Sequence, residues 1–169
     1  SYTRKDSLHI VSKQKLVNFE AQLRGALDDI FKTLNNFLET YFDNIGLNVW
    51  YSLDKIEVKY AKGKTNWNIY SNLKLVIQRG GTYLSNYKDD LNEAKLSAFS
   101  ICLYLASLKN NPSIVSYKLI YLDDVFIGLD TGNRMPILRI LEKEFSDYQI
   151  FISTHDRFWF ESSKLLFHN

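Results

Sequence analysis

Two short apolar runs that end in polar side chains constrain this chain more than any other feature. Residues 117–122 form a β-branched and aromatic run that stops at Asp123 and Asp124, and residues 149–153 form a second run that stops just before His155. A helical pattern lies between them, and a strand, a helix and a strand of these lengths make a βαβ crossover with parallel strands. The carboxyl ends of parallel strands meet at one edge of a sheet, where α/β proteins bind their ligands. The sequence therefore predicts the α/β fold class, with the acids and the histidine at one edge.

A long amphipathic helix is predicted from about residue 11 to residue 42. Apolar side chains recur there at steps of three and four, in a heptad-like seam with one extra step of four: Leu16, Phe19, Leu23, Ala26, Ile30, Leu34, Phe37 and Tyr41. A second row widens the apolar face toward its C-terminal end: Leu27, Phe31, Leu34, Leu38 and Phe42. The pattern fits an amphipathic helix packed on its own domain, and it also fits the root of a coiled-coil arm entering a globular head. Residues 1–42 are expected to form this element, and residues 43–169 the globular lobe.

From residue 48 to residue 77 the apolar period changes to two, which predicts a small antiparallel sheet. Residues 62–66 are expected to form a hairpin turn that joins the alternating runs 56–60 and 73–77. Gly80 and Gly81 are expected to end the sheet. The Gly-Lys-Thr sequence at 63–65 resembles the end of a P-loop. A P-loop needs an earlier glycine where this chain has Val58, and a helix directly afterwards, so a plain turn is the better interpretation.

Two shorter helices complete the predicted order. Residues 93–108 have one apolar face and follow Asn92, which is a good N-cap. Residues 135–145 form the crossover helix of the βαβ unit, with Asn133 as its expected N-cap and Pro136 in its first turn. The expected architecture is thus parallel βαβ strands with flanking helices, preceded by a long N-terminal helix and a small antiparallel sheet.

The composition excludes some classes of function but does not identify one. The 169 residues suffice for one domain with a real core, and a net charge of +2 is too small to indicate nucleic-acid binding by itself. Cys102 is the only cysteine, so the sequence excludes an internal disulfide and a cysteine-rich metal site, and its apolar surroundings predict an inert buried thiol. No apolar run reaches the ~18 residues of a membrane span. The polar start without an initiator methionine leads us to expect a fragment or processed chain, cytoplasmic and without a membrane partner.

The acids and the histidine have both plain and chemical interpretations. Magnesium prefers oxygen ligands, so a carboxylate at a rigid strand end, such as Asp123, suits it, and the adjacent Asp124 could orient or deprotonate water. A solvated turn after a strand is the plain alternative for this pair. His155 could be a satisfied structural histidine, could reach a phosphate, or could form a metal phosphohydrolase dyad with Asp156. That last chemistry needs further histidine ligands, and the only others are His9 and His168, near the chain ends.

Three segments in a fixed order resemble the SMC-like and RecF-like ATPases of the ABC type. Residues 91–106 are similar to the signature motif and its Ala- and Leu-rich helix, residues 122–130 to the extended Walker B motif and D-loop, and residues 152–156 to the H-loop. RecF-like members also have Asp-Asp in Walker B. The resemblance covers about residues 90–160, and it implies that this chain is the C-terminal lobe of such a head.

The resemblance implies ATP and Mg²⁺ as ligands and an ATP-dependent dimer of two heads. Asp123 would help to hold Mg²⁺, Asp124 would position the attacking water, and His155 would contact the γ-phosphate. Asp130 would tie the two ATP sites together. The signature residues would cap the ATP of the partner head: Asn92, Glu93, Ala94 and Lys95. The implied settings are DNA repair, chromosome maintenance or phage defence, with DNA as a candidate partner.

The chain departs from the family pattern in two ways. Asn92 replaces the usual serine and Ala94 the usual glycine of the signature motif. The chain also has no Walker A motif, which in SMC-like proteins lies in an N-terminal half, so that half is an implied partner and the chain alone should be inactive. The alternative function is a non-hydrolysing, ATP-gated clamp or scaffold lobe.

Overall fold

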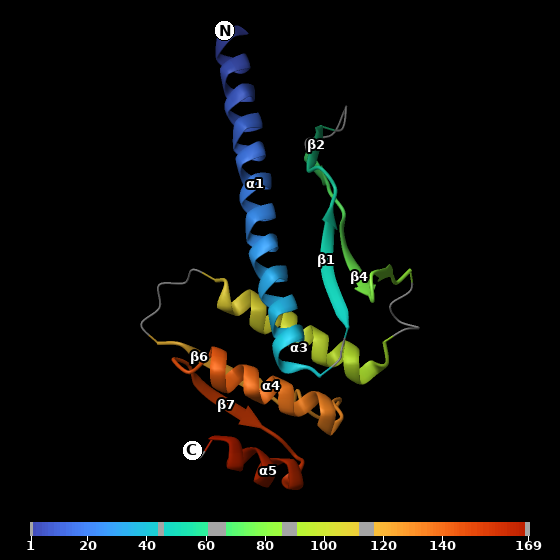
Figure 1. Ribbon diagram of the computed structural model, residues 1–169. Helices are drawn as coiled ribbons and strands as arrows, with labels where there is room; N and C mark the ends of the chain where they lie inside the picture. Colours follow the sequence, from blue (N-terminus) through green and yellow to red (C-terminus); the bar gives the residue numbers. More distant parts are fainter. Residues whose placement is uncertain (1, 44–45, 61–66, 86–90, 112–116, 168–169) are drawn as a thin grey trace.

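The structure is a computed structural model, and residues 2–43, 46–60, 67–85, 91–111 and 117–167 are described. Its elements follow the predicted order: a long helix, an antiparallel sheet, a helix and a parallel βαβ unit, with one more helix at the end (Figure 1). The predicted turn at residues 62–66 and its Gly-Lys-Thr sequence lie outside the described residues. Among the described helices, none is both long enough and apolar enough to cross a membrane.

Helix α1, Tyr2–Tyr41, confirms the predicted long helix and begins earlier than its apolar pattern does. Its N-terminal half stands clear of the rest of the molecule (Figure 1). Phe19 is 54% exposed there, whereas Phe31, Leu34 and Phe37 are buried. The narrow seam therefore lies on the projecting half, and the wide apolar face enters the core, as the widening pattern predicts.

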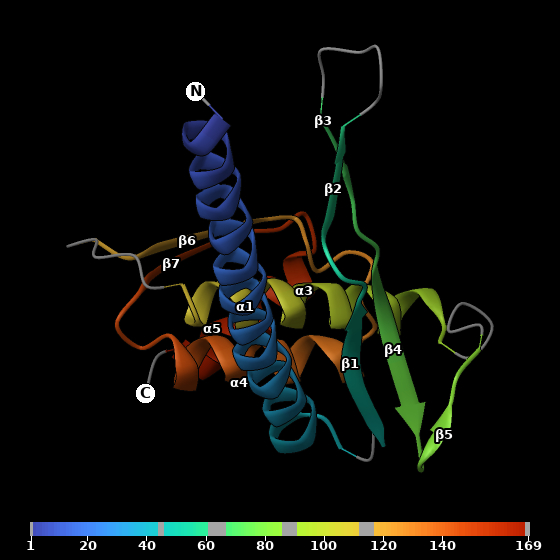
Figure 2. The same ribbon diagram turned by 90° about the horizontal axis from the view of Figure 1, so that it is seen from above.

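The antiparallel strands form two sheets, which follow one another along a long hairpin beside α1 (Figures 1 and 2). Strand β1, Leu47–Leu53, pairs with β4, Leu73–Arg79, and β2, Glu57–Tyr60, pairs with β3, Trp67–Tyr70. The sequence pattern joined the runs now seen as β2 and β4 through one turn, and that pairing is wrong. Alternation shows which residues share a face of a strand but does not identify the partner strand.

Gly80 and Gly81 turn the sheet instead of ending it, which corrects the prediction. Both have positive φ, 55° and 82°, and they link β4 to the short strand β5, Thr82–Tyr83. A two-residue turn of this kind needs left-handed backbone at both positions, which glycine adopts without strain.

Polar side chains of α1 satisfy the free edge of β1. The Asn35 side chain donates to the Val49 carbonyl at 2.7 Å and accepts from the Val49 N–H at 2.8 Å, as a neighbouring strand would. Farther along the same edge, the Arg24 guanidinium donates to the Leu53 carbonyl at 3.0 Å. Covering an edge strand with a helix removes its tendency to pair with another chain. These bonds also fix the hairpin against α1.

Helices α3, Glu93–Lys109, and α4, Thr131–Glu144, lie side by side under the C-terminal half of α1 (Figures 1 and 2). A single core unites the three helices, with fully buried side chains from each of them: Leu34, Phe37, Cys102, Leu105, Ile137 and Leu141. Burial raises the pKa of the Cys102 thiol to about 12, which agrees with the predicted inert thiol. A hydrogen bond also joins the ends of α1 and α4: the Tyr41 hydroxyl donates to the Glu144 carboxylate at 2.8 Å.

Helix α4 begins earlier than its sequence pattern indicates. Asp130 is its N-cap, with the carboxylate accepting from the Asn133 N–H at 2.9 Å, so the prediction of Asn133 as the cap is wrong. Asn133 is instead buried inside the helix, and Pro136 lies beyond the first turn. Asp and Asn cap helices equally well, so the local sequence is compatible with a helix that begins after Asp130 or after Asn133. Pro136 costs the helix the hydrogen bond to the Gly132 carbonyl.

Strands β6, Leu119–Asp123, and β7, Gln149–Ser153, are parallel, which confirms the predicted βαβ unit. Ile120 and Leu122 point into the helical core. The opposite face of the pair is open, with three large side chains exposed: Leu119 (56%), Tyr121 (61%) and Phe151 (44%). Parallel sheets occur almost only with both faces covered. A parallel sheet whose second face is apolar and uncovered is typical of a subunit or lobe interface.

Candidate functional site

The carboxyl ends of β6 and β7 bring Asp123 next to Ser153. The two residues are partners in the parallel register, and their side chains lie on the open face of the sheet. The Ser153 hydroxyl donates to one carboxylate oxygen of Asp123, Oδ1. One oxygen of the carboxylate is thus held in place, and the second oxygen makes no hydrogen bond to the described residues. This leaves the second oxygen available to a cation or to a bound water.

Asp124 and His155 face each other across the same edge. The backbone N–H of Asp124 donates to the Ser153 carbonyl at 3.2 Å, which extends the strand pairing by one bond. The His155 N–H lies 3.4 Å from Asp124 Oδ1, and His155 Nε2 lies 3.6 Å from Asp124 Oδ2. The side chain of His155 is 90% exposed and that of Asp124 is 28% exposed. The structure therefore brings these two predicted site residues together, as parallel strand ends should.

The backbone of Asp124 is left-handed, with φ of 55°, and it is the only described non-glycine residue in that region. Aspartate tolerates this conformation better than most residues. The turn that follows is folded tightly, with Leu129 N–H donating to the Phe126 carbonyl at 3.1 Å, and both side chains are buried. The chain thus leaves the strand sharply at Asp124, which turns that carboxylate toward the second strand end.

The residues of the signature-like segment lie at the start of α3. Asn92 is the N-cap, as predicted, with its side-chain oxygen accepting from the Lys95 N–H at 2.9 Å. A Cβ built on Gly128 would lie 3.7 Å from the Ser97 hydroxyl, so the first turns of α3 pass close to the turn after β6. Among the described residues, no hydrogen bond or ion pair joins the α3 N-terminus to Asp123, Asp124 or His155. The site residues therefore form two groups, and Asp130 caps α4.

The acids fit a magnesium site and do not form a closed metal cage. Within the described ranges, no group of three or more His, Cys, Asp and Glu side chains is placed to hold a metal ion. Magnesium is usually bound by one or two carboxylates together with substrate phosphates and waters, whereas structural zinc needs about four protein ligands. Asp123, with one oxygen anchored and one unengaged, matches the first requirement.

Several contacts that shape this edge were not predicted, although residues 122–130 and 152–156 were expected to lie there. Ser153 could have been found from the parallel register, since it is level with Asp123. Arg134 and Asp156 form an ion pair at 2.7 Å, and Trp159 stacks on Phe126 with ring centroids 4.5 Å apart. These pairs join residues from separate elements, and no local sequence pattern marks them.

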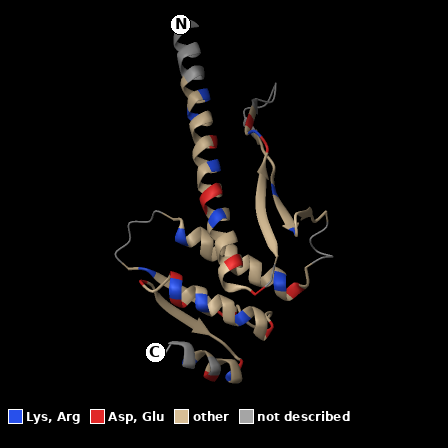
Figure 3. Cartoon of the chain, in the orientation of Figure 1, with Lys and Arg blue, Asp and Glu red and all other residues tan. Residues whose placement is uncertain are grey.

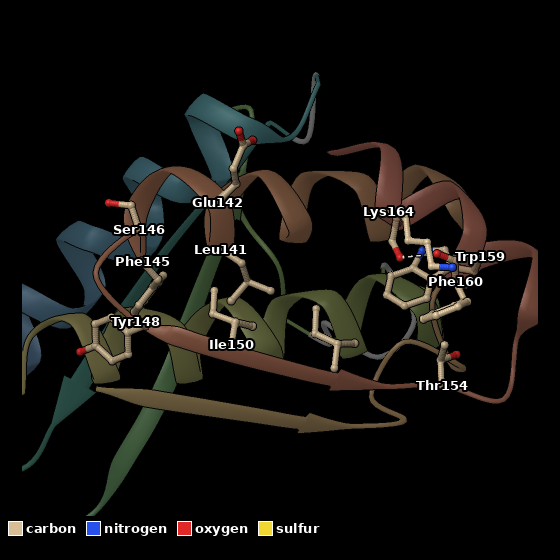
Figure 4. A pocket seen from close by; sticks show the side chains of 12 residues that line it. Leu141, Glu142, Phe145, Ser146, Tyr148, Ile150, Thr154, Trp159, Phe160 and Lys164 are labelled. Atoms are coloured by element: carbon tan, nitrogen blue, oxygen red, sulfur yellow. Dashed lines mark hydrogen bonds between the residues drawn. The ribbon is translucent and has the colours of Figure 1, made fainter. Parts of the chain in front are cut away.

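A hollow of about 440 Å³ lies between α4 and α5, Arg157–Phe167, on the face of β7 opposite its open face (Figure 4). Its lining is largely apolar, with Leu141 from α4, Ile150 from β7 and Phe160 from α5. Thr154 lines it as well, but none of the predicted site residues does. The hollow is thus separate from the acids and does not identify a substrate for them.

The sequence matches no protein-family model and no curated protein sequence. Its fold is similar to that of a chain solved in a study of the ATP-driven dimerisation and DNA-stimulated activation of SMC ATPases. The two chains superimpose with a TM-score of 0.54 at 10% sequence identity, over 82% of this chain and 73% of the other. At this identity the likeness concerns the fold, which is a mixed α/β architecture like that of an SMC ATPase.

Proposed function

We propose that this chain is the C-terminal lobe of an ATP-hydrolysing head of the SMC-like and RecF-like ABC type. One observation supports this proposal above the others: Asp124 and His155 face each other, 3.6 Å apart, at the carboxyl ends of adjacent parallel strands. That edge is where α/β folds bind nucleotides and other ligands. The SMC-like fold and the signature-like helix α3 agree with this assignment.

Each side chain at this edge has a separate role in phosphoryl transfer, which depends on positioning and electrostatic stabilisation. Asp123, oriented by Ser153, would hold Mg²⁺, which when bound neutralises charge on the phosphates of ATP. Asp124 positions the attacking water and accepts its proton. His155 is exposed at the same edge, so its ring can reach a γ-phosphate oxygen. Asp130 fixes the start of α4 and ties the turn after β6 to the neighbouring ATP site.

The open face of β6 and β7 supports the need for a second half. An open apolar face with Leu119, Tyr121 and Phe151 should be covered in the working protein. The proposed cover is the Walker A-bearing N-terminal half of the same head. That half supplies the backbone N–H groups and the lysine that cradle the α- and β-phosphates, and this chain has no such motif.

The proposed partners are a second head, in an ATP-dependent dimer, and DNA. The solved neighbour belongs to a study of ATP-driven dimerisation and DNA-stimulated activation, and we extend both features to this chain as proposals. Basic and acidic residues alternate along α1 and α4 in the cartoon of Figure 3. DNA contact would thus depend on separate lysines and arginines and not on a broad basic face. The proposed settings are DNA repair, chromosome maintenance and phage defence.

The 169-residue chain alone should not hydrolyse ATP appreciably, because it lacks a phosphate cradle. Mixing it with the N-terminal half should restore turnover toward the ~1–100 s⁻¹ of phosphoryl-transfer enzymes. Steady-state ATPase assays of the chain, of the N-terminal half and of the mixture test this. Turnover by the chain alone at such rates, abolished by Asp124→Asn, would contradict the split site.

Asn92→Asp should abolish ATP-dependent dimerisation of the complete protein and leave its melting temperature unchanged. Aspartate caps a helix as well as asparagine, but it would place a negative charge against the partner's ATP at the N-terminus of α3. Gel filtration with and without ATP measures the dimer. Asn92→Ala is the matched control for the cap, with an expected cost of about 0.5–2 kcal/mol in stability.

The non-hydrolysing clamp is the second candidate, because Asn92 and Ala94 depart from the usual serine and glycine of the signature motif. Normal ATP-dependent dimerisation of the Asn92→Asp protein would show that Asn92 only caps α3. Dimerisation of the wild-type protein with ATP but without turnover would favour the clamp.

A further inference from the structure

Arg134, in the first turns of α4, bridges the two turns that present the proposed site residues. Its Nε donates to the Leu129 carbonyl at 2.8 Å, in the turn that follows Asp124. Its Nη1 donates to Asp156 Oδ2 at 2.7 Å, and Asp156 directly follows His155. The Arg134 side chain is 14% exposed. One guanidinium thus contacts both turns through two different nitrogens.

Asp156 is well suited to transmit this contact because it is held on its other side. Its second carboxylate oxygen accepts from the Trp159 N–H at 3.0 Å, and its carbonyl accepts from the Phe160 N–H at 2.9 Å. Asp156 therefore caps α5 and pairs with Arg134 at the same time. The hydrogen bond from Arg134 lowers the pKa of the Asp156 carboxyl, so the ion pair persists at neutral pH.

An aromatic contact reinforces the bridge. The Trp159 ring, 4% exposed, stacks on Phe126 at 4.5 Å, and the Arg134 guanidinium lies 5.8 Å from its centroid. Phe126 belongs to the turn after Asp124, and Trp159 belongs to α5. The turn after β6 is therefore joined to the turn after β7 through Arg134, and to α5 through the stacked rings. Arg134 contacts both connections.

We infer that Arg134 is a positioning residue that holds His155 opposite Asp124 by tying the turn after β6 to the turn after β7. The inference rests on the proposed function for its catalytic consequence, but the bridge itself stands on the contacts above. An arginine is required, because its planar fork can donate to a carbonyl and a carboxylate at once. A lysine would offer one nitrogen in place of the planar fork, so it should hold the two acceptors less well.

The first test is turnover of the complete protein with Arg134→Gln. We expect kcat to fall about 10- to 100-fold, as when a catalytic group is misplaced by about 1 Å, with KM for ATP little changed. Arg134→Lys should recover only part of this loss. In a His155→Ala background, Arg134→Gln should cause no further loss, because its effect passes through His155. An equal loss in both backgrounds, or no loss in either, would overturn the inference.

Two further variants separate positioning from damage to the fold. Asp156→Asn keeps the cap of α5 but loses the charge partner of Arg134, so it should lower kcat in the same way. Lys164→Gln is the matched control, because it breaks the exposed ion pair with Glu161 on the same helix and should leave kcat unchanged. A loss of kcat with Lys164→Gln equal to that with Asp156→Asn would contradict a specific role for Arg134.

Hydrogen–deuterium exchange in the complete protein tests the bridge independently of catalysis. Arg134→Gln should raise exchange together in peptides covering residues 124–130 and 153–160, and Lys164→Gln should raise neither. If the wild-type protein shows no ATPase activity, the proposed function fails, and this exchange experiment still decides whether Arg134 joins the two turns. Increased exchange confined to α4 would overturn the bridge.

Discussion

Asp124→Asn should slow ATP hydrolysis by the complete protein by about 10²- to 10⁴-fold, which is the contribution of a positioned general base. Asparagine keeps the size of the side chain and can still hydrogen-bond to His155, but it cannot accept a proton. It also tolerates left-handed backbone, so the φ of 55° at this position should survive the change. Nucleotide binding should remain, and the protein should accumulate as an ATP-bound dimer. Steady-state turnover and gel filtration with ATP measure the two effects.

Asp147→Asn is the matched control for this change. Asp147 is an exposed carboxylate on the loop before β7, paired with Lys118, and lies away from the proposed site. Its replacement should leave turnover unchanged. Asp123→Asn should differ from both, because it should weaken magnesium-dependent nucleotide binding itself. Unchanged turnover with Asp124→Asn, without added dimer, would mean that Asp124 is only a turn residue.

Phe37→Ala should be the most damaging change to the fold, with a loss of about 3–5 kcal/mol in the free energy of unfolding. Phe37 is fully buried where α1 meets α3 and α4, so its removal leaves a cavity that three helices cannot all close. Denaturant unfolding of the chain measures the loss, as a lower midpoint at an unchanged slope.

Phe19→Ala provides a control on the same helix. Phe19 is 54% exposed on the projecting half of α1, so its replacement should change the stability by no more than about 0.5 kcal/mol. Equal losses for the two variants would show that the projecting half of α1 is also packed in solution. That result would favour a partner helix along the seam of α1.

The prediction of secondary structure succeeded where the controlling interactions are local. The period of the apolar residues found α1 and its widening face, and Asn92 was recognised as the cap of α3. Capping joins residues three positions apart, and helical and strand periods repeat within a few residues. Where two local solutions compete, as with Asp130 and Asn133 at the start of α4, the packing of the whole helix made the choice.

By itself, the sequence determined the order of the elements and the delivery of Asp123, Asp124 and His155 to strand ends, because strand direction and chain order follow from local pattern. Only the tertiary structure decided which strands pair in the long hairpin, and which groups hold the site residues in place. Arg134 and Asp156 are separated by more than twenty residues, and their pairing depends on how α4 packs against β7 and α5. Contacts of this range depend on the packing of complete elements, which no local pattern in the chain encodes.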